Sequence, residues 1–175
     1  MTRPQRRYWD SSAFLAWLWG EPGRVDECRA VITAAEEERV VIVTSALTLA
    51  EVVKLRNHPS LPPEKEKDVR DFFRHEWIVV YELDRTTAEL AREMVWAHGC
   101  PPKDSVHLAT AIRAKADRMD TYDGDDLLPL SGKIGDPALA IGKPGEMVQM
   151  AFSVDAAPAS EDDEAEDSPP EDYSP

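Results

Sequence analysis

One short run, VVIVT at residues 40–44, constrains the fold more than any other stretch of the chain. A strand with one face in water alternates apolar and polar residues, but this run shows no alternation. Both of its faces must therefore be buried, as in a parallel sheet that carries helices on both sides. The run predicts a central strand of an α/β sheet.

Segments with strand and helix patterns alternate along the rest of the chain. We expect further strands at residues 7–10 and 77–83, and a very short one just before Thr121. Helical patterns cover residues 13–19, 24–38, 46–56, 64–75, 85–98 and about 104–112, with Ser11 or Ser12 capping the first helix and Ser45 the third. This order predicts a mainly parallel sheet with helices packed on it.

The pattern weakens after Leu130, where only residues 138–141 and 147–152 suggest edge strands. We expect one domain over residues 1–154 and a disordered acidic tail over residues 155–175. The net charge of −14 comes largely from this tail, which holds nine acids and no Lys or Arg, so that residues 1–154 carry 25 acidic and 20 basic side chains. The tail can either restrain access to a basic groove or simply aid solubility.

Composition also bears on the cellular compartment. Cys28 and Cys100 have neither metal-ligand spacing nor the pattern of a disulfide framework, which favours a reducing environment. No apolar run approaches the roughly 20 residues that span a bilayer, and Gly20-Glu21-Pro22 does not resemble a signal-peptide cleavage site. We expect a cytoplasmic protein that does not insert into membranes.

Acidic residues recur where parallel strands would end. Asp10 follows the first strand, Glu51 lies on the helix after the second, Asp104 starts a helix with an apolar face, and Asp123 follows the last strand. Ligand sites of parallel sheets gather at these strand ends, so the four carboxylates can share one crevice. Such a cluster requires compensating cations, and oxygen ligands favour Mg²⁺ or Mn²⁺, which serve phosphodiester hydrolysis.

Simpler interpretations of these residues stay open from the pattern alone. Asp10 and Asp104 can be helix caps, and Glu51 can belong to a structural ion pair. Asp125 and Asp126 have the pattern of turn residues. His107, one helical turn after Asp104, can be either a ligand or a packed, hydrogen-bonding histidine.

Four motifs together resemble those of PIN-domain nucleases, particularly the VapC-like toxins of bacterial toxin–antitoxin pairs: WDSSAFLAWL, TSALTLAEVVKL, KDSVHLATAI and TYDGDDL, over about residues 7–130. The resemblance implies a three-layer α/β/α sandwich with a Rossmann-like, mainly parallel sheet, and a metal-dependent ribonuclease. The catalytic and metal-binding residues that it implies are Asp10, Glu51, Asp104 and Asp123, with Ser12, Thr121 and Asp126 in support.

The chain departs from the family pattern directly before Thr121. Such proteins have an apolar strand there, whereas this chain has Arg118, Met119 and Asp120. Whether these residues still form the strand that aims Asp123 stays open at this point.

The resemblance implies hydrolysis of RNA to a 5′-phosphate and a 3′-hydroxyl with one or two Mg²⁺ or Mn²⁺ ions. Candidate contacts to RNA phosphates are Arg7, Lys54, Arg56, Lys103 and Arg113. The implied partners are an RNA substrate, a cognate antitoxin and a second copy in a homodimer. The alternative is a catalytically inactive PIN fold that binds RNA or a protein. A Walker-type phosphate loop is absent from the sequence, which disfavours other Mg²⁺ phosphotransfer enzymes.

Overall fold

A five-stranded sheet in the order β3-β2-β1-β4-β5 forms the centre of the computed structural model, which describes residues 3–53 and 60–145. All neighbouring strands are parallel. Their bounds are Gln5–Trp9 (β1), Val40–Ser45 (β2), Ile78–Tyr81 (β3), Arg118–Asp120 (β4) and Ala140–Gly142 (β5). The run at residues 40–44 lies in β2, between two other strands, which confirms the central strand predicted for it.

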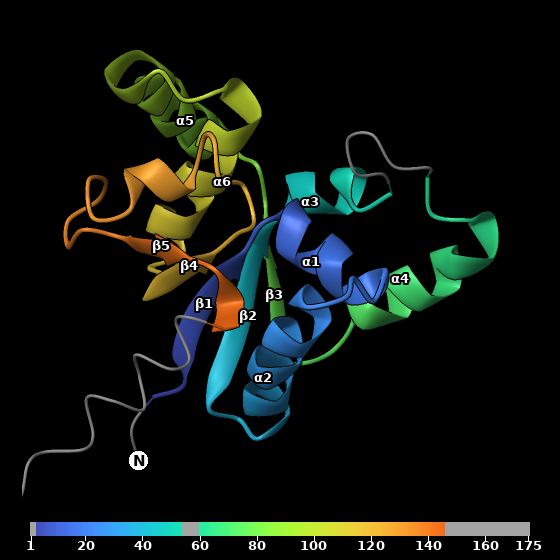
Figure 1. Ribbon diagram of the computed structural model, residues 1–175. Coiled ribbons are helices and arrows are strands. Elements are labelled where there is room, and N and C mark those ends of the chain that lie inside the picture. Colours follow the sequence, from blue (N-terminus) through green and yellow to red (C-terminus); the bar gives the residue numbers. More distant parts are fainter. Residues whose placement is uncertain (1–2, 54–59, 146–175) are drawn as a thin grey trace, which may run out of the picture.

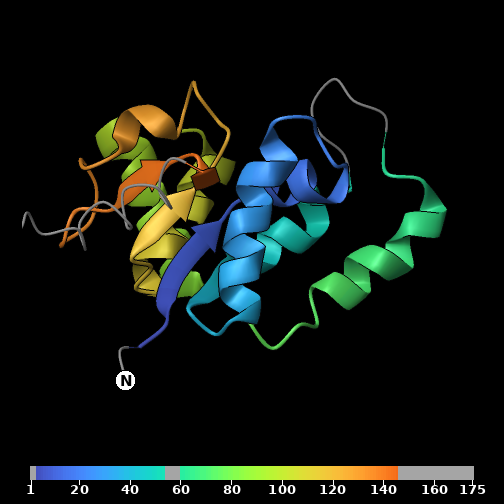
Figure 2. The ribbon, with the colours of Figure 1, turned by 60° about the horizontal axis from the view of Figure 1, so that its bottom comes forward.

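Helices cover both faces of this sheet, as Figures 1 and 2 show. Helices α5 (Arg85–His98) and α6 (Pro102–Arg113) lie on one side. On the other side lie α1 (Ser11–Leu18), α2 (Arg24–Glu36), α3 (Ala46–Glu51) and α4 (Glu66–Phe72). The predicted three-layer α/β/α sandwich is confirmed. None of the described helices is both long and apolar enough to cross a membrane.

Neighbouring residues of β1 supply the two halves of the core, because successive strand side chains point to opposite faces. Trp9 packs with the helices on one face, and its ring centroid lies 5.2 Å from that of Phe14 in α1. Tyr8 packs on the other face with Leu108 of α6 and Met119 of β4. Burying each such side chain contributes about 1.5–3 kcal/mol to folding.

Strand β4 forms despite the acid at its end. Asp120 is fully buried, and its carboxylate accepts hydrogen bonds from Arg7 Nη2 at 2.5 Å and from Trp9 Nε1 at 2.8 Å. Burial raises the pKa of Asp120, and the charge of Arg7 opposes this rise. Arg7, only 2% exposed, is thereby excluded as a contact for RNA phosphates.

Helix ends agree with most of the sequence predictions and correct one. Ser45 caps α3 as expected, since its Oγ accepts a hydrogen bond from Leu47 N. The cap of α1 is Asp10 rather than Ser11 or Ser12. Outside the described residues lie the predicted end of the third helix, an edge strand at 147–152 and the acidic tail, together with Lys54 and Arg56.

Candidate active site

The candidate site lies where the strands end. Asp10 directly follows β1, and Thr121 directly follows β4, its neighbour in the sheet. Strand β1 is flanked by β2 on one side and β4 on the other, so the chain order reverses at this point. Ligands of open parallel sheets bind in the crevice at such a reversal. The fold therefore brings residues from β1, α3, α6 and the turn after β4 to one place.

Three carboxylates lie close enough together to hold one metal ion. Asp104, Asp123 and Asp126 each offer an oxygen atom, and these atoms all lie within 4.8 Å of one another. Burial, and next the carboxylate of Asp123, raise the pKa of Asp104 to about 6. Partly buried carboxylates at such distances repel one another, and a divalent cation with oxygen ligands relieves this repulsion. The donor set therefore fits Mg²⁺ or Mn²⁺.

The turn after β4 is folded around Asp123. The backbone N–H of Asp123 donates to Thr121 Oγ1 at 2.9 Å, and its own Oδ1 accepts from the N–H groups of Asp125 and Asp126 at 3.1 and 3.0 Å. This turn brings Asp126 beside Asp104, while Asp125 is not one of the clustered acids. Asp126, expected only as a supporting residue, lies in the cluster itself.

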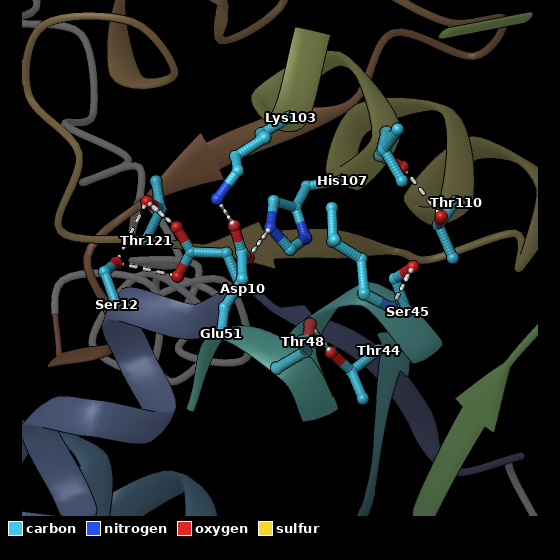
Figure 3. A network of polar contacts seen from close by, with 12 residues as sticks. Asp10, Ser12, Thr44, Ser45, Thr48, Glu51, Lys103, His107, Thr110 and Thr121 are labelled. Atoms are coloured by element: carbon cyan, nitrogen blue, oxygen red, sulfur yellow. Dashed lines mark hydrogen bonds and ion pairs between the residues drawn. The ribbon is translucent and has the colours of Figure 1, made fainter. Parts of the chain in front are cut away.

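Hydrogen bonds from neighbouring residues hold the Asp10 carboxylate in one orientation, as Figure 3 shows for Ser12 and Thr121. Its Oδ1 accepts hydrogen bonds from Ser12 Oγ at 2.7 Å and Ala13 N at 3.0 Å, and its Oδ2 accepts from Thr121 Oγ1 at 2.6 Å. Burial raises the pKa of Asp10, against the field of His107. The Asp10 charge in turn contributes to the raised pKa of Asp104, so the two carboxylates interact. Asp10 is nevertheless outside the group that lies within 4.8 Å.

Glu51, at the end of α3, has two other partners. Its Oε2 lies 2.8 Å from His107 Nε2, and its Oε1 lies 3.1 Å from Lys103 Nζ. Burial opposes ionisation here, but the hydrogen bond and charge of His107, together with Lys103, lower the pKa of Glu51 to about 2. The expected convergence of four acids is thus incomplete: Glu51 shares the crevice but is not in the three-carboxylate cluster.

His107 proves to be a hydrogen-bonding residue with both ring nitrogens engaged. It is 2% exposed, and its Nδ1 lies 2.8 Å from the Tyr8 hydroxyl. When Tyr8 donates to Nδ1, the proton of the neutral ring is on Nε2 and is directed at Glu51. Tyr8 therefore belongs to the site, although the sequence showed it only as an apolar residue of a strand.

The two remaining basic candidates, Lys103 and Arg113, form ion pairs with different acids. Arg113 is paired with Asp84 at the start of α5. Within the described part of the chain, Lys103 is the one Lys or Arg found in an ion pair with any of the five acids of the site.

Tyr122 is a second residue that sequence reasoning missed. Its hydroxyl donates to Glu27 Oε2 at 2.7 Å, and its ring lies beneath the Arg24 guanidinium, 4.6 Å from it. Its backbone N–H donates to Ser12 Oγ at 2.9 Å. The residue between Thr121 and Asp123 is thus anchored to α1 and α2. An aromatic residue between two site residues was the available signal.

Comparisons with known proteins bear on the family and the fold. The family model of the PIN domain matches residues 7–128. Among solved structures, the chain is similar to the Mycobacterium tuberculosis toxin VapC20, described as cleaving the sarcin-ricin loop, with a TM-score of 0.55 and 17% identity over 68% of this chain and 91% of that one. It is also similar to a toxin–antitoxin complex from Klebsiella pneumoniae, with a TM-score of 0.54 and 16% identity over 79% of this chain and 97% of that one.

No curated protein matches the sequence. At 16–17% identity, the structural likeness establishes the fold alone. The family model spans well over half of the chain and includes Asp10, Glu51, Asp104 and Asp123. On this match, the chain belongs to the PIN domain family.

Proposed function

We propose that this protein is a Mg²⁺- or Mn²⁺-dependent endoribonuclease and the toxin of a toxin–antitoxin pair. The observation that carries the proposal is the cluster of Asp104, Asp123 and Asp126, whose oxygens lie within 4.8 Å of one another. Membership of the PIN domain family and the toxins among the structural relatives support the same activity.

Each acid has a distinct role in this proposal. Asp104, Asp123 and Asp126 would hold the cation, which when bound would supply an activated water and balance charge on the phosphate. Asp10 keeps one orientation through Ser12, Thr121 and Ala13 N, and so presents a fixed negative charge to the same crevice. Glu51 is ionised at neutral pH, since its pKa is about 2.

The experiment is cleavage of RNA with Mg²⁺ or Mn²⁺ by the wild type and by Asp10→Asn, Asp104→Asn and Asp123→Asn. We expect each substitution to lower the rate at least about 100-fold, because outer partners of metal sites alone contribute 10–100-fold. Asp125→Asn is the matched control, since this exposed neighbour lies outside the cluster. Equal cleavage by all five proteins would refute the assignment.

The alternative function, a PIN fold that binds RNA or a protein without cleaving, is separated by metal uptake. A non-catalytic protein should take up no Mn²⁺ that depends on Asp104 and Asp123. Asp104 and Asp123 are half-buried, and neither forms an ion pair with another of the described residues. Their charges are therefore available to a metal ion, which favours the enzyme.

The proposed antitoxin has a candidate binding surface on the α3–α4 side. An apolar groove of about 690 Å³ lies there, and its rim includes Leu49 and Val53, which are 45% and 49% exposed. The relative from K. pneumoniae is described as a toxin–antitoxin complex, which supports an antitoxin as the occupant. Val53→Glu should then abolish inhibition by the antitoxin and leave RNA cleavage intact. A homodimer stays a prediction, to be tested by light scattering.

A further inference from the structure

Glu51 differs from the clustered acids of the site in the partners of its carboxylate. Asp104, Asp123 and Asp126 form the cluster that can hold a metal ion. Glu51 is outside that cluster, and each of its carboxylate oxygens already has a nitrogen partner. One partner is the Nε2 of His107, and the other is the ammonium group of Lys103. Figure 3 shows the Lys103 side chain extending from α6 to Glu51.

The ammonium group of Lys103 lies beside the Glu51 carboxylate, where a metal ion bound by Glu51 would also lie. It lies 3.1 Å from Glu51 Oε1, and Lys103 directly precedes Asp104 on the first turn of α6. The positive charge of Lys103 thus lies beside the carboxylate of Glu51, on the residue that precedes Asp104 of the acidic cluster. It therefore repels a second divalent cation that would use Glu51 as a ligand, while it leaves the cluster of Asp104, Asp123 and Asp126 free to bind one.

The side chains of Glu51 and Lys103 differ in exposure. The Glu51 side chain is 15% exposed and is fixed by His107, which is itself 2% exposed. The Lys103 side chain is 72% exposed, on a flexible four-carbon stem. Its charge can thus remain near Glu51 while its three N–H donors also reach an anionic oxygen from solvent. A phosphate oxygen of a bound RNA is such an anion.

We propose that Lys103 takes the place of a second metal ion at Glu51, so that the protein binds one divalent cation and uses the lysine as its second positive charge. This inference rests on the proposed metal site of Asp104, Asp123 and Asp126. It assigns Lys103 to the substrate phosphate, and it assigns to Glu51 the role of positioning Lys103 rather than that of a metal ligand.

The test is the number of Mn²⁺ ions bound per chain, measured by titration calorimetry and by electron paramagnetic resonance of free Mn²⁺. We expect one ion for the wild type and two for Lys103→Gln, because the neutral amide leaves Glu51 available to a second cation. Lys103→Arg, which keeps the charge, should bind one ion. Lys67→Gln is the matched control, since it removes an exposed lysine that is also paired with a carboxylate, that of Asp71, on α4. It should bind one ion as well.

RNA cleavage supplies a second readout. The rate of the wild type should rise with the first power of the Mn²⁺ concentration, and that of Lys103→Gln with the second power, from a level at least about 10-fold lower at limiting Mn²⁺.

The outcomes separate this inference from the proposed function. Two ions bound to the wild type, or a single ion bound to Lys103→Gln even with altered affinity, would overturn the role of Lys103 and leave the nuclease proposal in place. No Mn²⁺ bound to the wild type would overturn both.

Discussion

Arg7 and Asp120 form an ion pair in the interior of the protein, with Arg7 Nη2 2.5 Å from Asp120 Oδ1. The side chains are 2% and 0% exposed, and the second Asp120 oxygen accepts from the indole of Trp9. Trp9 and Asp120 are register partners in β1 and β4, one residue before Asp10 and Thr121. The pair thus joins the two strands directly beneath the site.

Replacing Asp120 alone should destabilise the protein strongly. Asp120→Leu leaves the Arg7 charge buried without its partner, which costs about 3–5 kcal/mol. The double variant Arg7→Met/Asp120→Leu removes both charges and should recover at least about 2 kcal/mol, with part of the remaining loss due to the unpaired Trp9 N–H. Urea unfolding of the three proteins measures this. A double variant no more stable than the single one would contradict the account.

This pair also shows where sequence reasoning ends. The strand at residues 40–44 was predictable because a local run of residues determines it, and Asp10 and Asp123 were predictable because parallel strands end at one edge. Whether Asp120 could end a strand stayed open from the sequence, because its partner, Arg7, is 113 residues away in the chain. The sequence does not predict the hydrogen bond between Glu51 and His107 for the same reason, since the two residues are 56 positions apart. Such pairings depend on the tertiary fold.

The metal-free protein should lose stability as the pH rises from about 4 to 7. Burial and the Asp123 charge raise the pKa of Asp104 to about 6, above its value in the unfolded chain. The folded state therefore binds the proton more tightly, and this contribution is complete below pH 4 and lost above pH 6. Asp104→Asn should reduce this pH-dependent loss of unfolding free energy by about 1–2 kcal/mol, after allowance for the partial exposure of Asp104. Thermal unfolding with EDTA across this pH range measures the difference.

Magnesium provides the control for this pH effect. At pH 7, saturating Mg²⁺ should stabilise the wild type, since a ligand that binds only the folded state adds RT ln(1 + [L]/Kd) to its stability. Asp104→Asn should respond much less. If both proteins gain the same stability from Mg²⁺, Asp104 does not hold the ion.

Removing the Thr121 hydroxyl should impair the site without unfolding the protein. This hydroxyl donates to Asp10 Oδ2 and accepts from Asp123 N, so it joins two site acids. Thr121→Val should weaken Mn²⁺ binding and RNA cleavage about 10–100-fold, as losses of outer metal-site partners do. Thr121→Ser keeps the hydroxyl and should retain most of the activity. An equal loss in Thr121→Ser, which removes only the methyl group, would contradict the role given to the hydroxyl.

Tyr8 should determine which nitrogen of His107 carries the proton. Its hydroxyl lies 2.8 Å from Nδ1, so a proton donated there leaves the hydrogen of the neutral ring on Nε2, facing Glu51. Nitrogen-15 NMR of the imidazole should show the Nε2–H tautomer in the wild type and a mixture in Tyr8→Phe. The rate of RNA cleavage by Tyr8→Phe should fall about 10-fold, because Glu51 loses a fixed partner. Tyr81→Phe removes a hydroxyl that accepts from Arg6 at another place on the sheet and should leave both signals unchanged. An unaltered His107 spectrum in Tyr8→Phe would show that Glu51, rather than Tyr8, fixes the ring.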